Sequence, residues 1–425
     1  LMGECGGDID IATNATPETI AALFAQTIPV GEQFGVMIVV RDTIPFEVAT
    51  FRSDVGVGDG RHPQGVVFTD SKTDALRRDF TINGLFFDPL SGEVIDYVGG
   101  REDITKGVVR AIGDPSLRFE EDYLRLIRAV RFSARFSFTI DSPTWEAMIR
   151  HREGIVRVSP ERVFQELEKM LQGPHCDRAI ELLHLSGLLS ILLPEIEHLI
   201  GVNQPAQFHP EGDVYVHTLK ALSLLDHPDR VTAWSVLLHD VGKPATMTVS
   251  DRIRFNNHNC VGATMAKQIL RRLRAPNALI DGVEAAIANH MNFMNVRSMR
   301  LSTLKRFLSR PTFDSELELH RVDCLASHGN LDNYYFLKEQ KVTLRLDQIK
   351  PPPLLRGRDL IEMGLTPGRA FKAILDAAYD LQLEERLSTH AEACAWVQQE
   401  VLPNPAAWLD RNLLTDGERQ DSPHE

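Results

Sequence analysis

Gly6-Gly7-Asp8-Ile9-Asp10-Ile11-Ala12-Thr13 is the stretch that decides the fold of the N-terminal region. A glycine turn precedes a β-branched run, which predicts a strand. Side chains alternate along a strand, so Asp8 and Asp10 are expected on one face, with Ile9 and Ile11 pointing into a core. Two neighbouring carboxylates suit a pair of divalent metal ions that drive phosphoryl or nucleotidyl transfer. The same spacing is also typical of a solvated edge strand.

Length and composition indicate a multidomain protein without a membrane span. The 425 residues exceed the ~250 to 300 residues that one core usually holds. The five cysteines are scattered and form no C-x-x-C, which favours the reducing cytoplasm and argues against structural zinc. No apolar run approaches ~18 residues, and no secretory leader is recognised. The net charge of -13 argues against indiscriminate coating of nucleic acid, although basic stripes at 267–274 and 297–310 leave local RNA contacts open.

The chain is predicted to have an α+β fold class. Strand and helix patterns alternate at first, and helical patterns prevail from about Ser116. Strands are expected at 35–40 and 46–51, a mobile loop at 53–65, and helix starts at Thr16-Pro17 and Ser159-Pro160. We expect a head at 1–110, a helical neck at 111–172, a helical body at 173–350, a helical tail at 351–413 and disorder at 414–425.

Further polar groups of the head have the chemistry of a nucleotide site. Glu47 alternates with Phe46 and Val48 in a strand pattern, so it is either a third metal-binding carboxylate or an ordinary edge glutamate. In Arg77-Arg78-Asp79-Phe80-Thr81-Ile82-Asn83, an arginine can grip phosphate, while Asp79 and Asn83 can fix a ribose hydroxyl.

Asp122 and Arg125 are predicted to share a helical face because they are three residues apart. They form either a surface ion pair or a protein template for a base. A carboxylate accepts from the exocyclic amine of cytosine or adenine, and an arginine N–H matches the ring acceptor beside it. Guanine and uracil present a carbonyl in place of the amine, so one such pair selects C and A together.

A second group of polar residues occurs in the helical body. His239 and Asp240 begin the string H-D-V-G-K, with His217 upstream and Asp323 far downstream. Imidazole and carboxylate ligands from several helices suit a divalent metal that activates water for phosphoester hydrolysis. The pattern resembles the HD phosphohydrolase superfamily. That resemblance implies the ligands His217, His239, Asp240 and Asp323, a phosphate contact by Lys243, and contacts of His258 and His290 with substrate or a second metal.

The strings D-I-D-I-A-T, E-V-A-T-F-R, G-D-G-R-H-P, R-R-D-F-T-I-N and E-D-x-x-R-x-x-R-x-x-R-F, in this order, resemble the motifs of bacterial CCA-adding tRNA nucleotidyltransferases and poly(A) polymerases. The resemblance implies a polymerase-β-like head, N-terminally truncated, on an all-helical neck, HD body and tail. It implies C and A addition to the tRNA 3′ end from CTP and ATP, with Mg²⁺ in the head and an unidentified divalent metal in the HD domain.

Carried over residue by residue, the resemblance assigns roles to the head and neck. The implied metal-binding and catalytic residues are Asp8, Asp10 and Glu47. The implied nucleotide-binding residues are Arg78, Asp79, Asn83, Asp122, Arg125 and Arg128. The family's G-G-x-V-R-D element would precede Leu1, so either the sequence is a fragment, which we expect, or the protein lacks a triphosphate clamp.

Several functional alternatives stay open. One is an A-adding or CC-adding tRNA enzyme or a poly(A) polymerase. The phenylalanine followed by glycine at 34–35 leans towards the tRNA enzymes, and the 53–63 segment leans towards terminal A addition. Another is a metal-dependent phosphohydrolase with an inactive head, and a third is a non-catalytic tRNA-binding protein.

Overall fold

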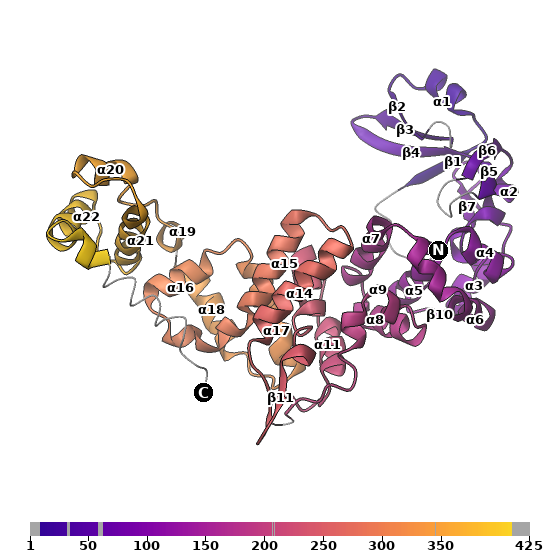
Figure 1. Cartoon of the computed structure of the whole chain (residues 1–425). Helices are drawn as coiled ribbons and strands as arrows, with labels where there is room; N and C mark the ends of the chain where they lie inside the picture. The colour runs from indigo at the N-terminus through magenta and orange to yellow at the C-terminus, as the bar shows by residue number, and fades with distance from the viewer. Residues whose placement is uncertain are drawn as a thin grey trace. The chain divides into compact units, whose positions relative to one another are not determined.

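The computed structural model of the chain describes residues 9–31, 35–57, 63–205, 207, 209–344 and 346–409. The chain divides into two compact units, Leu1–Ala288 with Leu325–His328 and Asn289–Cys324 with Gly329–Glu425. The first unit begins with sheets and continues with helices, whereas the described part of the second unit is helical (Figure 1). The predicted α+β class is confirmed. The predicted disordered segment, residues 414–425, lies outside the described residues.

A four-stranded sheet in the order β1-β4-β3-β2 opens the first unit. Its strands are β1 (Asp10–Thr13), β2 (Thr27–Gly31), β3 (Val36–Arg41) and β4 (Ile44–Thr50). β1 runs parallel to β4, and the other neighbours are antiparallel. α1 (Pro17–Leu23) lies against the sheet, where Ile20 packs with Met37 and Val48 (Figure 1). The expected strands are therefore confirmed.

The expectation that Ile9 and Ile11 point into a core is wrong. Ile9 is 68% exposed and Ile11 is 40% exposed. β1 stands at the end of the strand order, so its side chains have less cover than those of the inner strands. The small core of the sheet gathers around Val39 and Val48 on β3 and β4 instead.

A hairpin follows where the sequence predicted a mobile loop. β5 (Arg52–Val57) pairs antiparallel with β6 (Pro63–Phe68), so the loop prediction is wrong for these strands. Valines at positions 55, 57, 66 and 67 give both segments strand propensity, which outweighs the intervening glycines. Residues 58–62 lie outside the described part of the chain.

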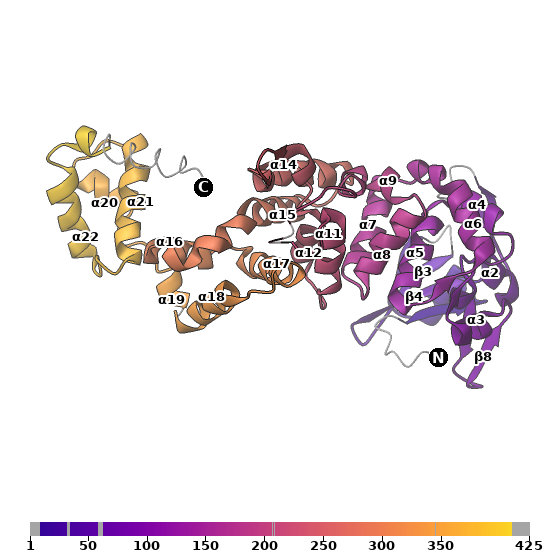
Figure 2. The ribbon, with the colours of Figure 1, turned by 90° about the horizontal axis from the view of Figure 1, so that it is seen from below.

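Short elements connect the sheet to the helical part of the first unit. They are α2 (Ser71–Arg77), η2 (Thr81–Asn83), β7 (Leu85–Asp88), β8 (Glu93–Asp96), α3 (Gly100–Lys106), β9 (Val108–Val109), α4 (Pro115–Glu121), α5 (Leu124–Phe136), β10 (Thr139–Ile140), α6 (Ser142–His151), η3 (Arg152–Arg157), α7 (Pro160–Leu171) and α8 (Cys176–Leu185). α5, α7 and α8 lie side by side (Figures 1 and 2). α5 buries Leu126, Ile127 and Val130, whereas its arginines occupy other positions of the helical repeat.

The remaining elements of the first unit are helices and one short hairpin, and they lie within the predicted body, residues 173–350, whose later part belongs to the second unit. They are α9 (Leu189–Leu192), α10 (Pro194–Glu197), α11 (Val214–Ser223), α12 (Arg230–Leu238), α13 (Lys243–Thr246), β11 (Met247–Val249), β12 (Ile253–Phe255), α14 (His258–Arg272) and α15 (Asn277–Asn289), whose last residue falls in the second unit. α12 is buried over nearly its whole length, and Trp234 at its centre stacks on Phe164 of α7. This stacking joins the body to the neck within one core.

The second unit contains two apolar clusters. Its elements are η4 (His290–Ser298), α16 (Leu301–Leu308), α17 (Phe313–Ala326), whose last two residues fall in the first unit, α18 (Asp332–Thr343), α19 (Leu346–Ile349), α20 (Gly357–Glu362), α21 (Arg369–Leu383), α22 (His390–Trp396) and η5 (Val397–Val401). Phe293 and Phe307 belong to the first cluster, and Leu360 and Ile374 to the second. The three prolines at 351–353 separate α19 from α20. Within the described residues, no helix combines the length and apolar character that a membrane crossing requires.

Candidate active sites of the head and body

The acidic positions of β1 and β4 face each other across a parallel strand pair. Asp10 is the register partner of Glu47, and both residues are exposed. Register partners on neighbouring strands project from the same face, so the two carboxylates share one side of the sheet. The prediction that Glu47 lies on a strand is confirmed, and the structure adds that this strand is the neighbour of β1. Asp8 lies outside the described residues.

This donor set fits a magnesium ion. Mg²⁺ prefers oxygen ligands, and it is commonly held by one or two carboxylates together with water and substrate phosphates. Asp10 and Glu47 supply such oxygens on an open face, where a triphosphate can approach.

Asp79 is the most constrained acidic residue of the predicted nucleotide site. It is 8% exposed, and its Oδ2 accepts a hydrogen bond of 2.7 Å from Arg128 Nε. Its Oδ1 accepts from Asn83 Nδ2 at 3.0 Å and from the Phe80 N–H at 2.9 Å. Burial opposes ionisation of Asp79, but Arg128 and these donors outweigh it and lower the carboxyl pKa. Three of the predicted residues, Asp79, Asn83 and Arg128, are thus brought together.

Arg78 is held beside this group by the buried Asp74. Its Nε donates to Asp74 Oδ2 at 3.2 Å, and one terminal nitrogen donates to the Asn83 carbonyl at 3.0 Å. The guanidinium also lies 4.6 Å from the centre of the Phe86 ring. These contacts fix Arg78 while its side chain stays 31% exposed, so it can still reach an anion.

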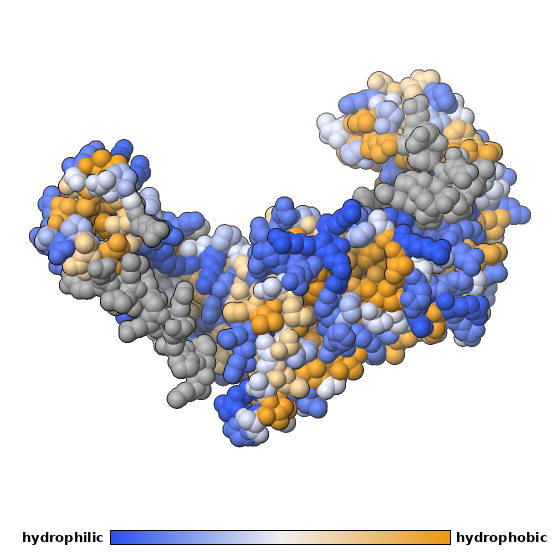
Figure 3. All heavy atoms as spheres, viewed as in Figure 1, coloured by the Kyte–Doolittle hydropathy of each residue, from blue (hydrophilic) through white to orange (hydrophobic). Residues whose placement is uncertain are grey.

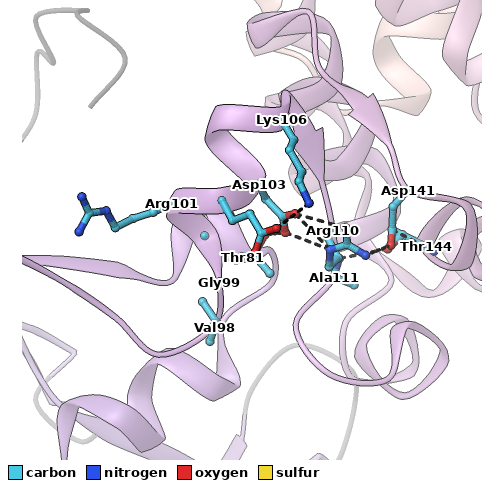
Figure 4. Close-up of polar contacts among 12 residues, drawn as sticks. Thr81, Val98, Gly99, Arg101, Asp103, Lys106, Arg110, Ala111, Asp141 and Thr144 are labelled. Atoms are coloured by element: carbon cyan, nitrogen blue, oxygen red, sulfur yellow. Dashed lines mark hydrogen bonds and ion pairs between the residues drawn. The ribbon is translucent and has the colours of Figure 1, made fainter.

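The backbone that carries Asp79 and Asn83 is braced by a second ionic network. Arg110 lies between Asp103 and Asp141: its Nε donates to Asp103 Oδ2 at 3.0 Å, and one terminal nitrogen donates to Asp141 Oδ2 at 2.6 Å (Figure 4). Asp103 Oδ2 also accepts from the Thr81 hydroxyl at 2.7 Å, and the Thr81 N–H donates to the Arg110 carbonyl. The network therefore ties η2 to α3 and to the start of α6.

The prediction that Asp122 and Arg125 share one helical face is wrong. Asp122 ends α4 in an extended conformation, and α5 begins at Leu124. The Asp122 side chain accepts from the Leu124 N–H at 3.1 Å, a local bond that competes with continuing the helix. The Arg125 N–H still donates to the Asp122 carbonyl, so one turn holds both residues.

Arg162 is a partner of Asp122 that the sequence interpretation missed. Its two terminal nitrogens donate to the two Asp122 oxygens at 3.2 and 2.7 Å, as a fork. Arg162 comes from the first turn of α7, within the string Ser159-Pro160-Glu161-Arg162 that marked a helix start. The available signal was an arginine directly after the predicted helix start at Ser159-Pro160. The fork fixes the plane of the Asp122 carboxylate.

Arg125 and Arg128 are anchored on different partners. Arg125 donates to Glu121, to the Arg118 carbonyl and to the Arg77 carbonyl. These bonds engage three of the five N–H donors of its guanidinium, so two can serve a ligand. Arg128 lies 3.8 Å from Glu166 in addition to its bond with Asp79.

The histidine and aspartate of the H-D-V-G-K string are buried in the body. His217 is 0% exposed, and His239 and Asp240 are each 1% exposed. His239 Nε2 lies 3.2 Å from Asp240 Oδ2, and His217 Nε2 lies 3.9 Å from the same oxygen. His239 Nδ1 is 2.8 Å from the Val236 carbonyl, which turns its other nitrogen towards Asp240. Three of the four predicted HD ligands are therefore gathered within the first unit.

Lys243 and His258 lie against the same aspartate. Lys243 Nζ donates to Asp240 Oδ2 at 2.7 Å and to Gln204 Oε1 at 2.5 Å, and His258 Nε2 is 3.7 Å from Asp240 Oδ1. Burial opposes the charge on Asp240, but His239 and Lys243 outweigh it and hold the carboxyl pKa well below its usual value.

Gly242 allows the two helices of this site to approach. A Cβ at this position would lie 2.3 Å from the His258 carbonyl oxygen. The glycine of the string therefore serves close packing of α13 against the start of α14.

Glu211 is a second residue that the sequence interpretation missed. Its Oε1 lies 2.6 Å from His217 Nδ1 and 3.0 Å from His209 Nδ1, and its buried Oε2 has no hydrogen-bond partner among the residues that the structure describes. Ligand atoms of His209, Glu211 and His217 all lie within 4.8 Å of one another. Burial raises the pKa of the Glu211 carboxyl, but the hydrogen bonds with His217 and His209 outweigh burial and lower the pKa to about 2. The signal was the string H-P-E-G-D directly before α11.

The body residues fit a divalent metal ion. Imidazole nitrogens and a carboxylate are the donors that transition metals and zinc take in proteins, and a carboxylate on the far nitrogen of a ligating histidine is typical. His290 and Asp323 belong to the second unit, at the start of η4 and within α17. Their part in this site stays a prediction.

Comparison with known families covers both sites. The family "Poly A polymerase head domain" matches residues 1–110, and "HD domain" matches residues 214–320. The chain carries a poly A polymerase head domain and an HD domain. Between them, the family "Probable RNA and SrmB- binding site of polymerase A" matches residues 137–200. The family resemblance inferred from the motifs is confirmed.

Curated proteins similar to this chain include CCA-adding enzymes. The enzyme of Bacillus pumilus (strain SAFR-032) is 44% identical over 198 residues, which are 46% of this chain and 49% of the relative. The enzyme of Geobacillus thermodenitrificans (strain NG80-2) is 34% identical over 289 residues, which are 68% of this chain and 63% of the relative. The chain therefore spans only about half to less than two thirds of these relatives.

A solved structure agrees over nearly the whole chain. The crystal structure of the Bacillus stearothermophilus CCA-adding enzyme in complex with CTP has a TM-score of 0.70 and 26% identity to this chain. The match covers 98% of this chain and 91% of that one.

Proposed function

We propose that this chain is part of an enzyme that adds C and A to the 3′ end of tRNA from CTP and ATP. The observation that carries the proposal is the likeness, over 98% of the chain, to a CCA-adding enzyme in complex with CTP. The chemistry of the head supports it, because Asp10 and Glu47 place two carboxylates on one open face.

The reaction is an in-line displacement at phosphorus. The terminal ribose hydroxyl of the RNA loses its proton and bonds to the α-phosphorus, while the bond to the bridging oxygen breaks and pyrophosphate leaves. Bound Mg²⁺ would stabilise charge on the attacking and leaving oxygens. Asp10 and Glu47, with the predicted Asp8, would hold the metal. Arg78 would bind the triphosphate, and Asp79 with Asn83 would orient the ribose.

Base selection is assigned to Asp122 and Arg125. The Asp122 carboxylate would accept from the exocyclic amine of cytosine or adenine, and Arg125 would donate to the adjacent ring nitrogen. The fork from Arg162 supports this assignment, because a fixed carboxylate plane discriminates better than a mobile one. Arg128 would reach the nucleotide from its position beside Asp79.

The test is nucleotide selection. The chain, joined to the G-G-x-V-R-D segment of a relative, is given tRNA with each of the four nucleoside triphosphates in turn. We expect efficient incorporation of C and A and little of G and U. Equal incorporation of all four would overturn the template assignment. Substrates that lack CCA, end in the first C or end in the second C separate full CCA addition from CC-adding, A-adding and poly(A)-adding activity.

A second activity is proposed for the body, because His217, His239 and Asp240 form a buried donor set that the transfer reaction does not use. A divalent metal bound there would activate water for phosphoester hydrolysis. We expect cleavage of a 2′,3′-cyclic phosphate to be lost in His239→Ala and kept in Asp10→Ala. Loss in both variants would refute an independent hydrolase, and activity in His239→Ala would remove this residue from the site.

A further inference from the structure

Gln204 carries a buried hydrogen-bond donor without a partner among the residues that the structure describes. The residue is 5% exposed, and its amide nitrogen, Nε2, makes no hydrogen bond within the described part of the chain. An unpaired buried donor destabilises a folded protein, and native structures keep few of them. The free Nε2 therefore points to a ligand that the chain itself does not supply.

The other end of the Gln204 amide is bound to the proposed hydrolytic site. Its Oε1 accepts from Lys243 Nζ at 2.5 Å, and Lys243 also donates to Asp240 Oδ2 at 2.7 Å. The reverse orientation of the amide would set its N–H groups against an ammonium that can only donate, so chemistry decides which end is the oxygen. Nε2 is bonded to the same carbon as Oε1, and it therefore lies within about 5 Å of Lys243 Nζ.

Lys243 adds a second donor beside this amide. An ammonium has three N–H groups, and the contacts of the described residues engage two of them, with Asp240 and Gln204. The ring of Phe255 has its centre 5.6 Å from Nζ and covers one side of the cation. Phe255 ends β12, in a hairpin that projects from the body with hydrophilic and hydrophobic side chains on its surface (Figure 3). Because Asp240 balances the Lys243 charge, the neutral amide of Gln204 supplies a further donor without further charge.

His209 marks the side from which a small anion can reach these donors. Its N–H donates to the carbonyl of Pro205, the neighbour of Gln204 in the chain, at 3.0 Å. The His209 side chain is 20% exposed, compared with 6% for Lys243 and 10% for His258. Gln204 therefore lies at the more open edge of an otherwise buried group of polar side chains.

We propose that Gln204 Nε2 and Lys243 Nζ together bind a non-bridging oxygen of the phosphate in the substrate of the body. The inference rests on the proposed hydrolytic activity, and it adds a substrate-binding residue from outside the string H-D-V-G-K. Phosphate oxygens accept strongly from amide and ammonium donors, and donors that Asp240 already holds in place lose little freedom on binding. The alternative is that Gln204 only orients Lys243 and never touches the substrate.

The test measures binding of inorganic phosphate to the chain loaded with Mn²⁺, by calorimetric titration. Gln204→Glu keeps an acceptor for Lys243 and replaces the amide nitrogen with an oxygen that cannot donate. The dissociation constant for phosphate should rise about 10- to 100-fold, as expected when a hydrogen bond to a charged group is lost. Gln172→Glu is the matched control, because Gln172 is a half-buried glutamine whose Nε2 donates to the Pro228 carbonyl; it should bind phosphate like wild type.

The uncharged variant Gln204→Met separates direct contact from positioning. It should also weaken phosphate binding about tenfold, while its affinity for Mn²⁺ stays as in wild type. If Gln204 touches the phosphate, Gln204→Met should weaken binding further in a chain that already carries Lys243→Met. No further effect would mean that Gln204 acts only through Lys243, and this would overturn the inference. If Lys243→Met does not fold or bind Mn²⁺, wild-type phosphate affinity in Gln204→Glu would overturn it instead.

Hydrolysis of a 2′,3′-cyclic phosphate distinguishes this inference from the proposed function. Phosphate binding that depends on Gln204, in a wild-type protein that hydrolyses no cyclic phosphate, would refute the proposed hydrolase and support the anion site. Hydrolysis with the same KM in wild type and Gln204→Glu would refute the anion site and support the hydrolase. A wild-type protein that binds Mn²⁺ but no phosphate would also overturn the inference.

Discussion

The acidic site of the head and the histidine site of the body differ in how far their side chains are exposed to solvent. Asp10 and Glu47 are exposed on an edge region of a small sheet, whereas His217, His239 and Asp240 are almost fully buried. An open pair of carboxylates leaves room for a triphosphate and an RNA end, which must complete the site themselves. A buried donor set is preorganised by its own neighbours. We therefore expect nucleotide incorporation by the head to be sensitive to the loss of a single carboxylate charge. We expect metal binding by the body to be sensitive to the loss of a hydrogen bond that positions a ligand.

The largest expected effect is in the head. Asp10→Asn keeps the size of the side chain and removes one negative charge from the proposed metal site. We expect nucleotide incorporation from CTP to fall by at least ~100-fold, because charge stabilisation at the displaced phosphate is lost. Single-turnover incorporation measures this, and cyclic-phosphate hydrolysis by the body should be unchanged.

Asp42→Asn is the control for this variant, since Asp42 is exposed on the turn between β3 and β4. It should incorporate nucleotide like wild type. If Asp10→Asn still incorporated C at the wild-type rate, Asp10 would not belong to the metal site, and the proposed difference between the head and the body would be wrong.

The next effect concerns Glu211, which tests whether the body depends on its supporting bonds. Glu211→Gln weakens the contact with His217 Nδ1 and should lower affinity for Mn²⁺ about 10- to 100-fold, the usual result when the partner of a ligating histidine is removed. Calorimetric titration with Mn²⁺ measures it without reference to activity. Glu284→Gln on the α15 surface is the control. Equal affinities in all three proteins would show that Glu211 does not position His217.

A smaller effect is expected from Arg162, which tests the base-reading turn. Arg162→Gln frees the Asp122 carboxylate from its fork, so selection of C and A over G and U should fall roughly tenfold, by loss of about one charged hydrogen bond. Competition between CTP and UTP in one reaction measures the ratio. Arg162→Lys, which keeps the charge but not the fork, should lose part of the selection. Unaltered selection in Arg162→Gln would mean that Asp122 is positioned by other groups.

The same contrast explains which parts of the molecule the sequence could predict. The strand pattern was enough to place Glu47 on a strand, although not to say which strand lies beside it, and the adjacent His239 and Asp240 marked the body site directly. Such patterns are local, and local periodicity survives folding. The exposure of Ile11 was not predictable from alternation, because it depends on which strand ends at the edge of the sheet.

Partners that come from distant segments were the main omission. Arg162 reaches Asp122 across 40 positions, and Glu166 reaches Arg131 across 35. No spacing rule connects such pairs, since the packing of α7 on α5 decides them. The turn at Asp122 was missed for a different reason: its side chain bonds to the Leu124 N–H, and a residue with that option can end a helix as readily as continue it.

The smallest effect is a pH dependence at Asp79, the buried charge of the head. Its pKa is lowered in the folded state, so the ionised form stabilises the fold above the usual value of 3.8, and this contribution is lost as pH falls below it. Arg128→Gln removes the cation that pairs with Asp79 and should lower the free energy of unfolding by roughly 1 kcal/mol near neutral pH, because the Arg128 side chain is itself partly exposed. The difference between wild type and Arg128→Gln in thermal unfolding should therefore shrink as the pH falls below 3.8, because protonated Asp79 gains little from Arg128. If the difference in unfolding temperature stayed constant over this pH range, Arg128 would act through Glu166 and not through Asp79. The nucleotide site would then contain no buried charge pair of Asp79 and Arg128 to contrast with the exposed carboxylates of Asp10 and Glu47.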